Sequence, residues 1–223
     1  MTKAITLKRP IIWFCAALIA FGSGVLMPYL EGRTNSIWIV PPVLPASVVP
    51  FVLLVVSCFV LLSTWMRSVM ARRNAVAAGL MFLAGLLLLG ASFKVPTAAL
   101  FRRGFNDYAK NALTADEWRG ISRFAQEHLP ADGRLPGPDK NLWNEKDHRA
   151  LWSALTAETQ VRRLDPSLMI FVRPEYTEIV WGGALLGHRA IIISTSRDGG
   201  AQREKSPTDL PVAEDIFTSA GPD

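Results

Sequence analysis

Three histidines, His128, His148 and His188, are the side chains best suited to hold a metal ion or to move a proton. They lie 20 and 40 residues apart, so no HxH, HxxxH or HExxH pattern pairs two of them locally. A metal site needs several converging ligands, usually with some local pairing. The two cysteines, Cys15 and Cys58, lie in apolar runs far from the histidines. We therefore expect no bound metal.

The sequence lacks the motifs of nucleophilic and phosphate chemistry. It has no GxSxG elbow, no P-loop and no GxGxxG fingerprint. Carboxylates such as Asp147 and Glu175 do not have the spacing of a general acid and base pair. The sequence predicts no catalytic residue and no cofactor, and an enzyme is the less favoured interpretation.

A proline-rich segment, residues 130–144, is the better candidate for binding a partner. It holds three prolines and two glycines. Proline restricts the backbone, so a contact here costs less ordering entropy. Leu135 and Trp143 are apolar anchors of the kind found at interfaces. The alternative is that Trp143 caps the core of its own domain.

The turn Gly187-His188-Arg189 is the densest polar feature near the predicted strands. Its side chains suit an anion, and the alternative is a hairpin turn with solvated side chains. Together with the proline-rich segment, it gives the expected partner-binding residues: Leu135, Trp143, His188 and Arg189.

Three apolar runs precede these segments, at residues 11–30, 48–66 and 75–93. Each has 19 or 20 residues without Asp, Glu, Lys, Arg or His. At 1.5 Å per residue, such a run forms a helix of about 30 Å, the thickness of the hydrocarbon core of a bilayer. We expect three transmembrane helices, with the lipid bilayer as their partner.

The basic residues around these runs predict the orientation. Residues 1–93 hold seven of the 24 Lys and Arg residues and one of the 19 acids. Six of the seven bases lie before the first run or between the second and third. By the positive-inside rule, residues 1–10 are cytoplasmic and the chain after residue 93 is outside. The outer part has no cysteine and folds without disulfides, which favours a bacterial inner membrane with a periplasmic domain.

The first run has two further features. Its charged start and Gly22-Ser23-Gly24 resemble a cleaved signal peptide, but apolarity continues past that point and two more runs follow. We therefore expect an uncleaved anchor. Ala16, Ala20 and Gly24 form a small-residue stripe that lets helices approach closely. Its expected partner is another span of this chain or a second copy of the protein.

The outer half begins with a juxtamembrane linker, residues 94–113, and continues into a domain at residues 114–196. Thr114 and Glu117 form a capping box that starts a helix ending near His128. A second helix starts at Asn144. Three strands follow, at residues 167–172, 176–181 and 188–194, and then a tail of Gly, Ser, Pro and charged residues, 197–223, that we expect to be disordered.

The fold class predicted from these elements is an integral membrane protein with three transmembrane α-helices. A small extracytoplasmic α+β domain follows, with two helices packed on a three-stranded antiparallel meander. The outer half has balanced charge, so nucleic acid is not an expected partner. Two functions remain open. One is a non-catalytic domain that binds an envelope protein or the membrane surface, and the other is a membrane-anchored enzyme acting on an envelope polymer or peptide.

Overall fold

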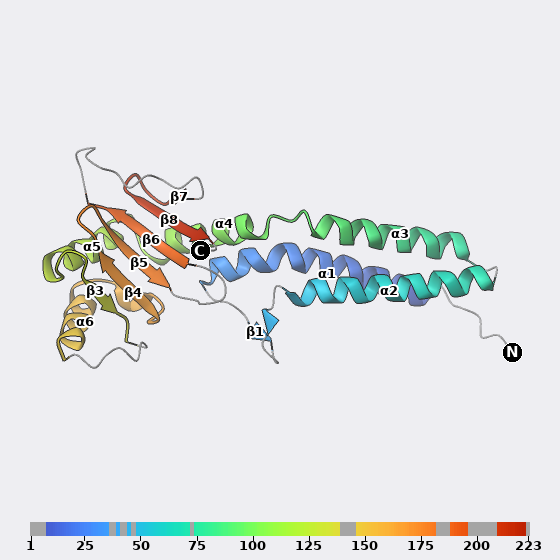
Figure 1. Cartoon of the computed structure of the whole chain (residues 1–223), viewed down its shortest axis with the longest axis horizontal. Helices are drawn as coiled ribbons and strands as arrows, with labels where there is room; N and C mark the ends of the chain where they lie inside the picture. The colour runs from blue at the N-terminus through green and yellow to red at the C-terminus, as the bar shows by residue number, and fades with distance from the viewer. Residues whose placement is uncertain are drawn as a thin grey trace. The chain divides into compact units, whose positions relative to one another are not determined.

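The structure of the chain is a computed structural model. It describes residues 8–35, 39–40, 44–45, 48–71, 74–138, 146–181, 188–195 and 209–221. The chain divides into two compact units, Met1–Phe101 and Arg102–Asp223 (Figure 1). Long apolar helices make up the first unit, and an antiparallel sheet with helices makes up the second.

Three helices form the first unit, and they lie side by side (Figure 1). They are α1 (Lys8–Arg33), α2 (Val48–Met70) and α3 (Ala75–Ser92). Each is long and apolar enough to cross a membrane, so the three predicted spans are confirmed as helices of the required length. Between α1 and α2, strands β1 (Ile39–Val40) and β2 (Leu44–Pro45) form a short antiparallel pair.

The surface of these helices is apolar. Side chains such as Ile19, 70% exposed, and Leu87, 75% exposed, point away from the unit. In the described part of the chain, every large apolar side chain that is left exposed lies between Ile11 and Phe93. In water, this surface would be unfavourable by roughly 25 cal/mol for each Å². Contact with lipid removes that cost, so the surface is consistent with a membrane-spanning unit.

Glycines of α3 let α2 approach closely. A Cβ added to Gly79 would lie 2.9 Å from Nε1 of Trp65, and one added to Gly85 would lie 3.2 Å from Cδ1 of Leu61. The Trp65 ring stacks on Phe82, with ring centroids 5.6 Å apart. Small residues at these positions therefore allow the large side chains of α2 to pack against the α3 backbone.

The second unit contains more helix than the sequence predicts. Its helical elements are α4 (Thr97–Ala112, which begins in the first unit), α5 (Ala115–His128), α6 (Lys146–Glu158) and the 3-10 turn η1 (Val161–Arg163). The prediction of a linker at residues 94–113 is wrong for the residues in α4. The reason is that Phe105 and Ala109, one turn apart, are both fully buried and hold this helix against the domain.

The sheet has six antiparallel strands in the order β3-β4-β5-β6-β8-β7. They are β3 (Arg134–Pro136), β4 (Leu168–Val172), β5 (Tyr176–Trp181), β6 (His188–Ser194), β7 (Leu210–Pro211) and β8 (Ile216–Gly221). The predicted meander corresponds to β4, β5 and β6 and is confirmed. The prediction of only three strands and two helices is wrong, because β3, β7, β8 and α4 also belong to the domain.

The prediction of a disordered tail is wrong for residues 209–221. Strand β8 pairs with β6 over six residues, from His188 opposite Gly221 to Ile193 opposite Ile216. Ile216 is 0% exposed and Thr218 is 2% exposed, so alternate side chains of β8 enter the core. The remainder of the predicted tail, residues 197–208 and 222–223, lies outside the described residues.

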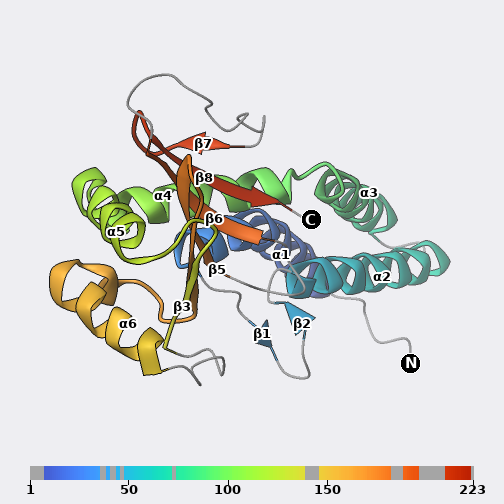
Figure 2. The ribbon, with the colours of Figure 1, turned by 60° about the vertical axis from the view of Figure 1, so that its left-hand side comes forward.

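One face of the sheet packs against the helices, and Figure 2 shows the sheet from its edge. Trp181 of β5 contacts Phe105 of α4, with ring centroids 5.8 Å apart and planes at 78°. The hydroxyl of Ser122 in α5 donates to Thr177 in β5 at 2.8 Å. Helix α6 packs beside α5 and β3. The core of the domain therefore lies between α4, α5, α6 and this face.

Candidate functional site

The stripe expected on the first span lies largely at a contact within the chain. Ala20 is 4% exposed and packs with Leu54 of α2, and a Cβ on Gly24 would lie 3.6 Å from the Cβ of Pro50. Ala16 is half-buried, while its neighbour Ala17 is 0% exposed. Of the two expected partners, the structure places α2 of the same chain against Ala20 and Gly24.

The proline-rich segment is built into the sheet instead of standing apart from it. Leu135 lies in β3 opposite Ile170 and is 1% exposed, so its side chain belongs to the core. The N–H of Gly137 donates to the carbonyl of Leu168 at 2.8 Å. A Cβ on Gly137 would lie 2.1 Å from the carbonyl oxygen of Pro166, so only glycine fits here. Trp143 lies outside the described residues.

Arg189 lies on the buried side of the sheet. It is 7% exposed and stands in one cross-strand row with Leu168, Trp181 and Ala220. Burial lowers the pKa of its guanidinium, and the nearby Asp165 and Tyr108 act in the opposite direction. The backbone of His188 pairs in β6, and its side chain lies outside the described part. Arg189 is thus held in the domain interior and is not a solvated turn residue.

The aromatic side chains beside Arg189 form a compact group. The Trp181 ring meets Phe105 and Tyr108 edge to face, with centroids 5.8 and 6.0 Å apart. The indole Nε1 of Trp181 is buried and has no hydrogen-bond acceptor among the described residues. Edge-to-face packing points the positive edge of one ring at the π-face of another, which compensates such a donor in part. This group is the centre of the domain core, where Arg189 reaches it from β6.

The other histidines do not converge on Arg189. His128 is exposed at the end of α5, where its ring stacks on Phe124 at 4.1 Å between centroids. His148 lies in α6. Among the described residues, no three His, Cys, Asp or Glu side chains are grouped closely enough to hold a metal ion.

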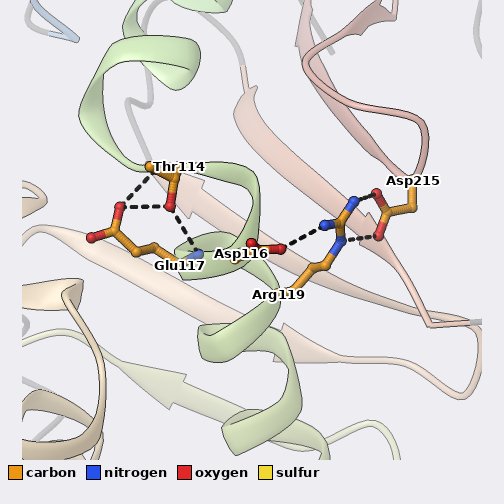
Figure 3. Close-up of polar contacts among 5 residues, drawn as sticks. All are labelled: Thr114, Asp116, Glu117, Arg119 and Asp215. Carbon is orange, nitrogen blue, oxygen red and sulfur yellow. Dashed lines mark hydrogen bonds and ion pairs between the residues drawn. The ribbon is translucent and has the colours of Figure 1, made fainter.

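A polar cluster on α5 was not anticipated from the sequence, and Figure 3 shows it. Nε and Nη2 of Arg119 donate to the two carboxylate oxygens of Asp215 at 2.8 and 2.7 Å. Nη1 of the same guanidinium donates to Asp116 at 2.8 Å. These hydrogen bonds raise the pKa of Arg119. The bidentate pair joins α5 to the β7–β8 turn across 96 positions of sequence, which no local pattern could have indicated.

The capping box predicted at the start of α5 is present beside this cluster (Figure 3). The N–H of Thr114 donates to Oε2 of Glu117 at 2.7 Å, and the N–H of Glu117 donates to Oγ1 of Thr114 at 3.3 Å. The bond from the Thr114 backbone, followed by that from its hydroxyl, lowers the pKa of Glu117. Glu117 also pairs with Arg163 of η1 at 3.2 Å. These groups hold α5 in place.

A pair of arginines on α4 remains outside these networks. Arg102 is half-buried and Arg103 is exposed. In the described part of the chain neither pairs with an acidic side chain, whereas Arg119, Arg163 and Arg173 each do. The sequence shows these bases, but the linker prediction gave them no fixed position. The helical pattern of the apolar residues around them was the signal that was missed.

Comparisons of the chain with protein-family models, with curated proteins and with solved structures find no match. The candidate site has two parts: a structural network on α5 and the sheet, and two arginines on α4 that have no acidic partner among the described residues.

Proposed function

We propose that the protein is a multi-pass protein of a bacterial inner membrane that carries a non-catalytic binding domain on the extracytoplasmic side. In this role, α1, α2 and α3 anchor the chain and the second unit presents a folded surface next to the bilayer. The ligand of that surface is the membrane itself or a protein of the envelope.

The observation that carries this proposal is the change in surface character between the two units. The first unit leaves large apolar side chains exposed, such as Ile19 and Leu87. Within the described residues of the second unit, the large apolar side chains are buried or half-buried. A surface without large exposed apolar patches is that of a domain in water. The surroundings of the chain therefore change from lipid to water close to residue 101.

The orientation is supported by the charge distribution. Lys3, Lys8 and Arg9 precede α1, and Arg67, Arg72 and Arg73 lie at or beyond the end of α2. Short loops with such an excess of Lys and Arg stay in the cytoplasm. An odd number of spans then carries the second unit to the other side.

A binding role is supported by how the polar groups of the domain are used. The Thr114–Glu117 box, the Arg119–Asp215 pair and the Ser122–Thr177 bond each join one element to another. Side chains whose hydrogen-bonding groups are occupied in this way are poorly placed to take part in a reaction. The domain is therefore a stable scaffold, and its exposed charges are the groups that can meet a ligand.

Fusions of alkaline phosphatase test the location of the domain. A fusion after Gly104 should be active, because the enzyme folds only outside the cytoplasm, and a fusion at Ser68 should be inactive. Fusions of a cytoplasmic reporter at the same two positions should give the opposite pattern. Activity at Ser68 and none at Gly104 would overturn the proposed orientation.

Crosslinking in intact cells tests the binding role. The full chain and a chain ending at Phe101, which keeps the three spans, are compared at equal levels in the membrane. Proteins or lipids that crosslink to the full chain alone are ligands of the domain. If both chains give the same crosslinks, the domain has no binding role.

A further inference from the structure

Helix α4 carries Arg102 and Arg103, which follow the last residue of α3 by ten and eleven positions in the sequence. Gly104, Phe105 and Ala109 are buried, so the helix cannot rotate without exposing them. Arg103 is exposed and Arg102 is half-buried beside it. Arg103 therefore lies on the side of the helix away from Phe105, whereas Arg102, three residues before Phe105, starts on the buried side and reaches solvent with only part of its side chain.

Chain connectivity keeps this pair close to the end of the third span. Helix α3 ends at Ser92, and α4 begins at Thr97 after only four intervening residues. The connection is compact: the N–H of Lys94 donates to Ala91 at 3.0 Å, and the N–H of Thr97 donates to Val95 at 2.8 Å. Arg102 lies in the second turn of α4, about 8 Å of helix beyond Thr97. The long side chain of arginine extends this reach toward the polar layer of the bilayer.

We infer that Arg102 and Arg103 form a binding site for the phosphate groups of anionic phospholipids in the leaflet that faces the domain. A guanidinium donates two parallel hydrogen bonds to phosphate oxygens, and two adjacent guanidinium groups favour a headgroup with net negative charge. Neither arginine has an acidic partner in the described part of the chain, so binding breaks no ion pair there. This inference rests on the proposed anchoring of the domain at a membrane.

Native mass spectrometry of the full-length protein tests the inference. The protein is equilibrated in detergent micelles with equal amounts of phosphatidylglycerol, which is anionic, and phosphatidylcholine, which is neutral overall. Each basic residue near an anionic surface contributes about 1 kcal/mol. Two arginines therefore predict that bound phosphatidylglycerol exceeds bound phosphatidylcholine by about thirtyfold.

Variants of both arginines and a matched control identify the residues responsible. R102Q/R103Q should bring the ratio of the two lipids close to one. The matched control is R123Q/R162Q, which removes two exposed arginines of α5 and η1 that have no acidic partner among the described residues. The control should keep the preference. R102K/R103K, which retains both charges, should keep most of it. If R102Q/R103Q fails to fold, the single variants R102Q and R103Q replace it, and each should lower the ratio of the two lipids.

Three results would overturn the inference. They are equal binding of both lipids by the wild type, loss of the preference in R123Q/R162Q, and a preference that survives in R102Q/R103Q. Inorganic phosphate is added in a separate arm at the concentration of the lipid. Displacement of phosphatidylglycerol by phosphate would show that free phosphate is the ligand. Because the assay uses no cell, its outcome is separate from that of the fusions that test the orientation.

Discussion

Replacing Ile216 with alanine tests whether the end of the chain is part of the domain. Ile216 begins β8, pairs with Ile193 of β6 and is 0% exposed. The shorter side chain removes buried methyl groups and leaves a cavity between the sheet and the helices. Substitutions of this kind cost 2 to 5 kcal/mol, and we expect about 3 kcal/mol for Ile216→Ala because the site is fully buried.

Urea unfolding of the full-length protein in detergent micelles measures this loss. The transition is followed by tryptophan fluorescence, since Trp118 and Trp181 are 0% exposed in the folded domain. The free energy of unfolding falls by roughly 1 to 3 kcal/mol for each molar increase in urea. A loss of 3 kcal/mol should therefore lower the midpoint by roughly 1 to 3 M.

Ser219→Ala provides the matched control, because Ser219 lies on the opposite face of the same strand and is only half-buried. It should change the free energy of unfolding by about 0.5 kcal/mol or less. A loss below about 1 kcal/mol for Ile216→Ala would refute the reasoning. That result is what a disordered tail would give, and it would mean that β8 does not contribute to the core in solution.

Substitutions at Gly137, Gly79 and Glu117 test three other contacts, and those at Gly120 and Gly90 are controls. Gly137→Ala places a Cβ against backbone carbonyls and should lower the free energy of unfolding by at least about 1 to 3 kcal/mol in the same urea assay. Gly120→Ala lies in open space on α5 and should raise the free energy of unfolding by up to about 1 kcal/mol. Gly79→Leu should lower the mole fraction of SDS at which the three helices of the first unit unfold. Gly90→Leu should not lower it, because a Cβ added to Gly90 has no neighbour within 4 Å. The carboxylate of Glu117 has a lowered pKa in the folded state. Its contribution to the stability of the domain is therefore present above its unfolded pKa of about 4.3 and is lost as the pH falls through its folded pKa. Glu117→Gln should therefore destabilise the domain at pH 7, and its difference from the wild type in urea unfolding should shrink as the pH falls below about 4.3.

The elements that the sequence predicted correctly are set by local patterns. The helix after Thr114 follows from a capping box that spans four residues, and both of its reciprocal hydrogen bonds are present. The strands at residues 168–172 and 176–181 are short apolar runs separated by a turn with Pro174. The spans follow from their length and the absence of charge. In each case the deciding interaction lies within about twenty residues of sequence.

The elements that were missed depend on partners far away in the chain. Strand β8 is stabilised by β6 and by the bond of Asp215 to Arg119, which lies 96 positions earlier. Nothing near Ile216 in sequence reveals these contacts, so its mixture of polar and apolar residues resembles a solvated tail. Strand β3 is similar, because the glycine that follows it, Gly137, is explained only by the carbonyls of Pro166 and Leu168 that it approaches.

Arg189 differs from these cases, because its buried position could have been predicted from the sequence alone. Side chains two residues apart share one face of a strand. Arg189 therefore shares a face with Ile191 and Ile193, which are 0% and 1% exposed. The alternation places this arginine on the core side of β6. The interpretation as a solvated turn gave more weight to the preceding glycine than to the strand that follows it.

The correction of the linker to a helix also changes what the arginines at its start can do. On a flexible linker, Arg102 and Arg103 would lose backbone freedom each time they bound a phosphate, at a cost of roughly 1 to 2 kcal/mol for each ordered residue. On α4 that freedom is already lost on folding, because Phe105 and Ala109 fix the helix in the core. The core packing of α4 and the binding of phosphate by Arg102 and Arg103 are therefore linked. A variant that loosens the core beneath α4, such as Phe105→Ala, should weaken the preference for phosphatidylglycerol although it leaves both arginines in place. An unchanged preference in a variant with a clearly lowered urea midpoint would show that the arginines bind lipid without the support of the folded helix.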